Sequence, residues 1–146
     1  MKNTVIIKYL ILLIIILNNV SCHSNQAGMD TMKIEQIEKI AKIQLPSKLD
    51  QINTYTEKGI DLLLMIHFKL NAKEVNQFIS ESNLNPLKKN YRPFINDFGV
   101  GLDWWNIGDV KNAFGTVQYF DDGTCRMTML ETSDIETNSV YIIIQK

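Results

Sequence analysis

The chain has few of the residues with which small proteins hold metals or form disulfides. Its 146 residues include two cysteines and two histidines, too few and too badly spaced for the nitrogen and sulfur ligand sets of zinc sites. A glycine-rich phosphate loop is also missing, because Gly99-Val100-Gly101 lacks a third glycine and the strand–helix context. We therefore expect no metal and no cofactor, and no stretch of the sequence matches a catalytic motif.

An excess of positive charge is missing as well. The formal net charge is −1, and removal of residues 1–21, which hold two lysines and no acid, makes it −3. A mildly acidic chain offers neither the basic excess that attracts nucleic acid nor a polybasic surface for anionic lipid. The composition therefore predicts no nucleic-acid partner.

No apolar run is long enough to cross a bilayer as a helix, which takes about 20 residues. Residues 9–17 (YLILLIIIL) are wholly apolar, and counting back past Lys8 to Val5 gives only 13 residues. A basic segment with Lys2 and Lys8 precedes this run, and the polar residues 18–21 (NNVS) follow it. This order is typical of a secretory signal peptide. A signal segment that stays uncleaved as a membrane anchor is the alternative.

A cysteine follows this segment directly, in the stretch Val20-Ser21-Cys22. The stretch resembles the lipobox of bacterial lipoproteins, although Asn19 stands where that family prefers leucine. The resemblance implies cleavage before Cys22 and attachment of lipid to it, with the domain held outside the cytoplasm in the cell envelope. Several acyl chains on one residue provide the multiple attachment that stable anchoring requires. The alternative is ordinary secretion, with Cys22 a free thiol or paired with Cys125.

Three parts of the chain follow from this interpretation. Residues 1–21 are the expected signal peptide, residues 22–28 are a lipid-anchored tether, and residues 29–146 form a single domain. A chain of this size buries enough surface to fold without a metal or a disulfide. The domain resembles small envelope lipoproteins, a likeness that implies no activity.

Two helices are predicted in the domain. The first begins near Asp30, with Asp30 or Thr31 as its cap, carries an apolar stripe and ends at Pro46. The second begins after Asn71, whose side chain can cap the helix while Glu74 reaches back to close a capping box. An apolar stripe then continues the second helix for about three turns.

Five strands are predicted around these helices, at residues 51–57, 60–70, 115–120, 124–131 and 140–145. The 60–70 segment alternates strictly, and its second face also carries apolar residues, so that face is expected to be partly covered. An Asp-Gly turn joins the third and fourth strands as a hairpin. The last strand is apolar on both sides and is expected to be central. The sum is an α+β fold of order α-β-β-α-loop-β-β-β, a mostly antiparallel sheet with two helices on one face.

A long segment, residues 84–109, shows neither the helical nor the strand period. A loop of this length is unusual in a compact domain and is often functional. Five of the 13 aromatic residues of the chain lie within it, which argues for a packed loop rather than a disordered one; they are Tyr91, Phe94, Phe98, Trp104 and Trp105.

The two consecutive tryptophans of this loop form the candidate binding site. If the backbone there is extended, one indole points into the core and the other outward. An outward Trp104 or Trp105, with Tyr91, Arg92 and Asp103 nearby, could stack on a sugar ring, a peptide or a partner side chain. The alternative is an aromatic plug over the open end of the sheet, since large aromatics more often fill cores.

Two classes of function remain open at this stage. The first is a binding or structural module that presents residues 86–106 to an envelope protein or a glycan, with no catalysis. The second is an envelope hydrolase that uses loop carboxylates such as Asp97 or Asp103. A nucleophilic role for Cys125 is disfavoured, because this residue shares a strand face with two methionines and is expected to be a small buried hydrophobe.

Overall fold

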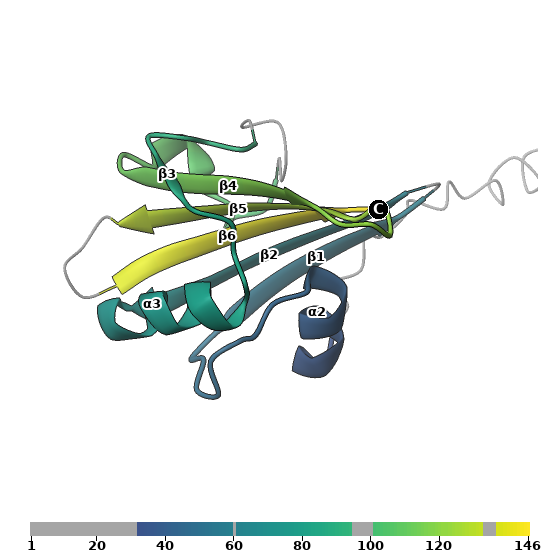
Figure 1. The fold of residues 1–146 in the computed structure, drawn as a ribbon, viewed down its shortest axis with the longest axis horizontal. Coiled ribbons are helices and arrows are strands. Elements are labelled where there is room, and N and C mark those ends of the chain that lie inside the picture. The colour runs from purple at the N-terminus through teal and green to yellow at the C-terminus, as the bar shows by residue number, and fades with distance from the viewer. Residues whose placement is uncertain (1–31, 60, 95–100, 133–136) are drawn as a thin grey trace, which may run out of the picture.

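The structure, a computed structural model, describes residues 32–59, 61–94, 101–132 and 137–146. These residues form a six-stranded antiparallel sheet with the strand order β1-β2-β6-β5-β4-β3. The strands are β1 (Ile52–Lys58), β2 (Leu62–Asn71), β3 (Lys88–Lys89), β4 (Ala113–Tyr119), β5 (Cys125–Thr132) and β6 (Thr137–Gln145). The other described elements are the helices α2 (Ile34–Ala41) and α3 (Ala72–Glu81) and the 3-10 turn η1 (Ile107–Asp109) (Figure 1).

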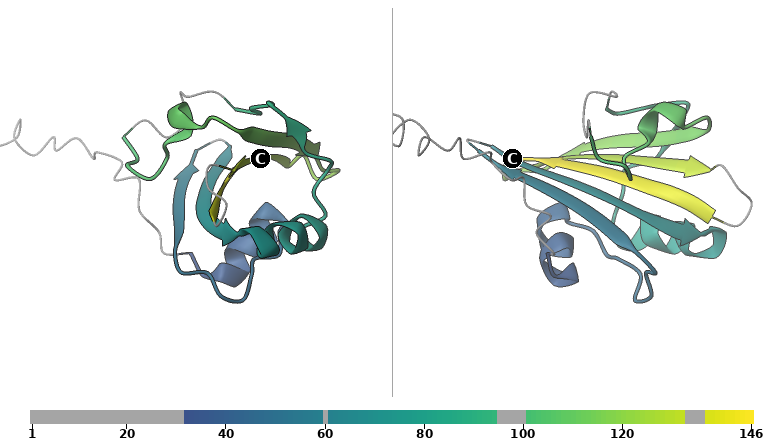
Figure 2. Two further views of the ribbon diagram at one scale, coloured as in Figure 1. Left: turned by 90° about the vertical axis from the view of Figure 1, so that its left-hand side faces the viewer. Right: turned by 180° about the vertical axis from the view of Figure 1, so that it is seen from behind.

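The predicted α+β class and antiparallel sheet are confirmed. The sheet has a sixth strand because the two residues of β3 pair with the start of β4, Lys88 opposite Gly115 and Lys89 opposite Phe114. Figure 2 shows that the sheet is curved, with α2 and α3 on its inner side and η1 on its outer side. The helices therefore share one face of the sheet, as predicted.

The last strand, β6, lies between β2 and β5 at the centre of the sheet, as its sequence predicted. Ile142, Ile143 and Ile144 on this strand are completely buried. Ile142 and Ile144 belong to the core under the helices, while Ile143 belongs to a second core on the opposite face. Because side chains of a strand alternate between faces, a strand that is apolar on both sides requires a sheet that is covered twice.

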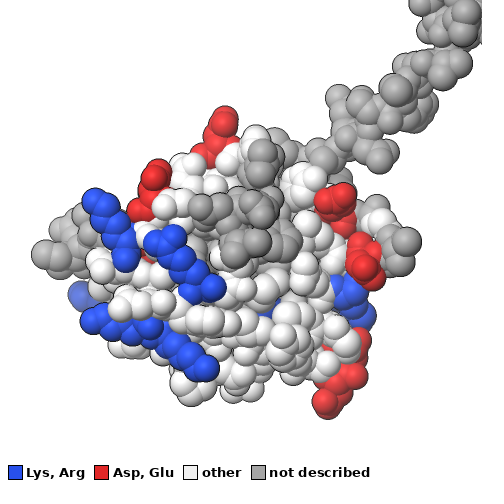
Figure 3. All heavy atoms as spheres, turned by 90° about the horizontal axis from the view of Figure 1, so that it is seen from above, with Lys and Arg blue, Asp and Glu red and all other residues white. Residues whose placement is uncertain are grey.

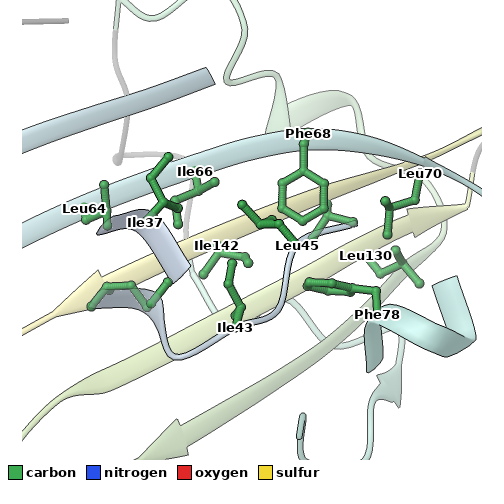
Figure 4. Packing of buried hydrophobic residues seen from close by; sticks show 13 residues of the cluster. Ile37, Ile43, Leu45, Leu64, Ile66, Phe68, Leu70, Phe78, Leu130 and Ile142 are labelled. Carbon is green, nitrogen blue, oxygen red and sulfur yellow. The ribbon is translucent and has the colours of Figure 1, made fainter. Parts of the chain in front are cut away.

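The core under the helices, which we call the helix-face core, contains the alternating face of β2 (Figure 4). Phe68 of β2 packs edge-on against Phe78 of α3, with ring centroids 5.4 Å apart. Other members of this core come from α2, the segment after it and the strands β2, β5 and β6; those labelled in Figure 4 are Ile37, Ile43, Leu45, Leu64, Ile66, Leu70, Leu130 and Ile142.

Helix α3 begins as predicted. The Asn71 side chain accepts hydrogen bonds from the backbone N–H groups of Lys73 and Glu74, each at 3.0 Å. The Glu74 carboxylate in turn accepts a bond from the Asn71 N–H at 3.1 Å. These contacts complete the capping box and satisfy N–H groups that have no partner within the helix.

Both predicted ends of the first helix are wrong, because α2 has Lys33 as its N-cap, begins at Ile34 and does not reach Pro46. Asp30 and Thr31, the predicted caps, lie outside the described residues. The helix ends at Ala41, and Lys42 adopts a left-handed conformation with φ 53°. The chain then runs extended so that Ile43 and Leu45 both reach the helix-face core. The Glu38 side chain fixes this exit, because its carboxylate accepts a bond from the Leu45 N–H at 2.8 Å.

One charged side chain, Arg126 of β5, is buried on the helix face and is only 1% exposed. Its guanidinium donates to backbone carbonyls where the helices end: Ala41 and Lys42 after α2, and Ser82 and Asn83 after α3. The Gln118 side chain accepts a further bond at 2.6 Å. A cation among the carbonyls at two helix C-termini is stabilised by the negative ends of both helix dipoles. Arg126 therefore links the two helices to each other and to the sheet.

Candidate functional site

The loop between α3 and β4 covers the outer face of the sheet. Its buried residues Phe94, Trp105, Ile107 and Val110 pack against side chains of the strands beneath them. We call this whole cluster of loop and strand residues the loop-face core. The strand contribution comes from β2, β4, β5 and β6: Met65, Ala113, Met127, Met129, Tyr141 and Ile143. The described part of the loop is therefore packed along one face of the sheet and places large aromatic side chains in a core.

Trp105 is the inward residue of the tryptophan pair and is 5% exposed. Its indole contacts Tyr141 edge-on, with ring centroids 5.3 Å apart, and Phe94 at 5.6 Å. Its Nε1 atom has no hydrogen-bond partner among the described residues. Because large aromatic side chains contribute much of the burial in a core, Trp105 anchors the loop to the sheet.

Trp104 lies at the margin of the same cluster and is half-buried. Its ring is nearly parallel to the His67 imidazole, with centroids 6.2 Å apart, and meets Trp105 edge-on at 5.6 Å. The sequence-based expectation of opposite orientations assumed an extended backbone. The segment turns instead, since the Trp105 N–H donates to the Leu102 carbonyl at 2.9 Å. Both indoles therefore contact the loop-face core, and only Trp104 keeps part of its surface accessible.

His67 of β2 lies beneath the tryptophans and is 8% exposed. The Asn53 amide nitrogen lies 3.3 Å from its Nδ1 atom, and its Nε2 atom has no partner among the described residues. Burial and then the charge of Lys69 lower the pKa of His67 to about 4. A neutral imidazole with this low pKa is a weak base near pH 7, so the position favours packing over proton transfer.

The loop backbone lies very close to the sheet at Gly115 of β4. A methyl group at this position would collide with the backbone carbonyl of Tyr91 and would lie 2.6 Å from Cδ of Pro93. Only a residue without a side chain allows the loop backbone to cross here. Gly115 therefore determines where the loop crosses β4.

The other predicted binding residues are exposed. Tyr91 is 38% exposed, and the Lys88 ammonium lies 5.8 Å from the centroid of its ring. Arg92 is exposed and its guanidinium donates to the Val110 carbonyl. Asp103 is exposed beside Trp104, and its backbone carbonyl accepts a bond from Asn106 at 3.1 Å.

These predicted residues form two groups. Tyr91 and Arg92 lie beside β3 and the start of β4, whereas Asp103 and the two tryptophans belong to the turn above His67. The ion pairs found in the described part of the chain both involve Asp122, so Arg92 and Asp103 do not pair with each other. The loop thus has a basic part and an aromatic part.

No arrangement of acids for hydrolysis is seen among the described residues. Asp97 lies outside them, and Asp103 is exposed on a turn. Asp122 has a pKa held well below its usual range, because Lys42, Thr124 and Lys146 donate to its carboxylate. This carboxylate lies in the predicted Asp-Gly hairpin turn, where Gly123 has φ +82°. The contacts of Asp122 with Lys42, Thr124 and Lys146 indicate that this carboxylate stabilises the hairpin.

Two hollows are lined by described residues, and the larger one includes His67, the residue beneath Trp104. One, of about 430 Å³, lies where β2 extends beyond β1 and is lined mainly by polar residues, including Lys48, Asn53, Lys69 and Glu74. The other, of about 240 Å³, is shallow and includes Cys125. Burial raises the pKa of the Cys125 thiol, which lowers its thiolate fraction and its reactivity. Searches of the described residues find no group of three or more potential metal ligands.

Sequence reasoning missed two features of this molecule. Arg126 shares one face of β5 with Thr128 and Leu130, and a charge on a face that is otherwise uncharged is the signal that could have identified a buried cation. Lys88, Lys89 and Lys111 join Arg92 around the start of β4, but Lys111 is distant in sequence from the others. Only the pairing of β3 with β4 brings them together.

Comparison of the chain with protein-family models, with curated proteins and with solved structures finds no match. In the described part of the chain, no helix has the length and apolar character needed to cross a membrane.

Proposed function

We propose that the protein is a lipid-anchored binding module of the bacterial cell envelope, tethered through Cys22, that presents loop residues 86–106 to an envelope partner. The anchor is supported by the order of basic, apolar and small polar residues before Val20-Ser21-Cys22. A folded domain of six strands and two helices follows the tether. The proposal assigns no chemistry to the domain.

The observation that supports the binding role is that some residues of the loop are buried while others are exposed. Trp105 and Phe94 are buried in the loop-face core, whereas Tyr91 and Arg92 on the same loop remain exposed. A loop anchored by buried aromatics holds its exposed residues in a fixed arrangement, which lowers the entropic cost of binding a partner. Exposed Tyr and Arg are also the residue types most enriched at interaction surfaces.

The anchor is tested by growing cells with labelled palmitate. Wild-type protein and the Cys125→Ala variant are expected to carry label, whereas the Cys22→Ala variant is expected to carry none. Cys125→Ala is the matched control because it removes the other cysteine of the chain. Label that persists on Cys22→Ala would refute lipidation at this residue.

The binding role is tested by crosslinking the intact protein in cells. Tyr91→Ala and Trp104→Ala are expected to reduce capture of the partner about tenfold, since each truncates an accessible aromatic of the loop. Tyr119→Ala is the control, because Tyr119 is 80% exposed at the opposite end of β4. Capture that survives both loop variants, or that falls equally in Tyr119→Ala, would exclude the loop as the binding surface.

A further inference from the structure

We infer that the basic part of the loop docks the domain onto the anionic phosphate headgroups of the membrane to which it is anchored. The surface consists of Lys88, Lys89, Arg92 and Lys111 with the exposed ring of Tyr91, and we call it the basic edge. This inference rests on the proposed anchoring, and it names the partner that this part of the loop contacts.

The fold brings the four cations together around one short stretch of backbone. Lys88 and Lys89 lie opposite Gly115 and Phe114 in the β3–β4 register. Arg92 reaches the Val110 carbonyl, next to Lys111. All four side chains are exposed. Figure 3 shows basic side chains gathered on the side of the molecule where β3 lies in Figure 1.

These charges have little internal compensation. The ion pairs of the described residues lie at the β4–β5 hairpin, where Lys42 and Lys146 contact Asp122, and include none of the four cations. Among the described residues, the acids close to the basic edge in the chain or the sheet are Asp109, which is exposed, and Glu131, which is half-buried opposite Ala113. Among the described residues the four cations outnumber these acids. The net charge of the chain, from which the sequence predicted no polybasic surface for anionic lipid, therefore does not describe this edge.

The shape of the basic edge favours a surface over a small ligand. Among the hollows lined by described residues, neither includes a residue of the basic edge. Three of the four cations are lysines, which act as mobile point charges and lack the rigid bidentate geometry that specific anion sites use. Tyr91 adds an exposed ring with a polar tip, the side-chain type found at the boundary between headgroups and water. Clustered lysines with an interfacial aromatic match a plane of anionic headgroups.

The proposed anchor keeps the domain close to the bilayer. The described chain begins at Met32, and the ten residues from Cys22 to Thr31 span at most about 35 Å when fully extended. The domain is thus confined to the first few nanometres above the bilayer, where weak electrostatic attraction is sufficient to orient it. Because exposed charges are screened within about 10 Å at ordinary ionic strength, the contact is expected to be sensitive to salt.

The same lysines have another physical explanation. Charged residues on an edge strand prevent it from pairing with the edge of another sheet, and β3 is an edge strand of this sheet. Edge protection requires charge but no partner. It predicts that neutral variants self-associate and that the wild type ignores anionic vesicles, so the two explanations differ in their outcome.

The test uses the processed chain 22–146 with Cys22→Ala, so that no acyl chain contributes; every described element lies within it. Vesicles of phosphatidylcholine with about 30% phosphatidylglycerol are compared with phosphatidylcholine alone, at low and physiological salt. We expect binding to the anionic vesicles only, weakened by salt. No binding to anionic vesicles at low salt overturns the inference.

The variant Lys88→Ala/Lys89→Ala/Arg92→Ala/Lys111→Ala is expected to lose at least about tenfold in affinity for anionic vesicles. The control removes four exposed lysines elsewhere, Lys39, Lys48, Lys69 and Lys73, and changes the net charge equally. An equal loss in both variants shows that net charge alone matters and overturns the inference. A triple lysine variant that keeps Arg92 is measured beside the quadruple one, in case loss of the Arg92–Val110 contact disturbs the fold.

Failure of this inference is distinguishable from failure of the proposed function. If the chain ignores anionic vesicles while palmitate labelling and crosslinking still depend on Cys22 and Tyr91, the loop binds a partner other than lipid. If the label is absent from the wild type, the anchor itself is refuted, whatever the vesicles show.

Discussion

The face of the sheet under the helices and the face under the loop are held by different interactions. On the helix face, hydrogen bonds fix the ends of the elements: Asn71 caps α3, Glu38 fixes the exit of α2, and Arg126 joins both helices. On the loop face, rings pack on rings around Trp105 and His67. The comparison shows that a segment without regular structure can cover a sheet if large aromatics replace helix contacts.

The first prediction concerns the hydrogen bonds of the helix face and has the largest expected effect. Arg126→Met removes the donor and leaves several carbonyls at the helix ends without a partner. We expect a loss of about 4 kcal/mol in the free energy of unfolding, measured by urea titration. Arg92→Met, which changes an exposed arginine, is expected to cost under about 1 kcal/mol. Equal midpoints for the two variants would show that Arg126 does not hold the helices.

The second prediction concerns the rings of the loop face. Trp105→Ala is expected to cost about 3 kcal/mol, because it empties the centre of the loop-face core. Trp104→Ala is expected to cost about 1–2 kcal/mol, because this residue is only half-buried. Each variant retains one tryptophan, so fluorescence reports the unfolding of the loop in both. The reverse order of stability would contradict the assignment of Trp105 as the anchor.

The third prediction tests the crossing of the loop over β4. Gly115→Ala forces a methyl group against Tyr91 and Pro93 and is expected to cost about 2 kcal/mol. Gly59→Ala is the control, since a methyl group there meets nothing within 4 Å; it is expected to be neutral or slightly stabilising. Thermal melts of both variants measure the difference, and a harmless Gly115→Ala would mean that the loop can lift from the sheet.

The fourth prediction is a pH effect on the loop face and is the smallest. The pKa of His67 is about 4 in the folded state and about 6.5 in the unfolded state, so the unfolded state binds more protons between these values. Stability therefore falls as the pH drops from about 6.5 to about 4, by about 1–2 kcal/mol at pH 5. Urea titrations of wild type and His67→Gln across this range are expected to differ in slope; parallel curves would contradict burial of a neutral His67.

The parts of the fold that sequence reasoning predicted correctly are those with local causes. Asn71 and Glu74 are three residues apart, and their capping box depends on nothing else in the chain. The alternation of apolar residues in β2 and the apolar residues on both faces of β6 likewise indicate which faces of these strands are buried. Local pattern therefore predicted five of the six strands of the described sheet, helix α3 and the class of the fold, but not the two-residue strand β3.

The parts that could not be predicted depend on distant partners. Helix α2 ends at Ala41, and the extended chain after it buries Ile43 and Leu45 in the helix-face core. The apolar spacing of the helix contains no information about this burial. The turn at Trp104 places its ring beside His67 of β2, a residue far away in the chain. The backbone carbonyls that accept from Arg126 lie 43 to 85 residues away from it in the chain. Long-range contacts of this kind leave no periodic signal in the sequence.

The position of Arg126 also has a consequence for the way the domain opens. Detachment of the last turn of either α2 or α3 would take two carbonyl acceptors from a guanidinium that remains inside the protein. Such a step is unfavourable unless the other helix detaches as well. The two helices are therefore expected to behave as one cooperative unit, and the amide hydrogens of both exchange with solvent through a shared opening event.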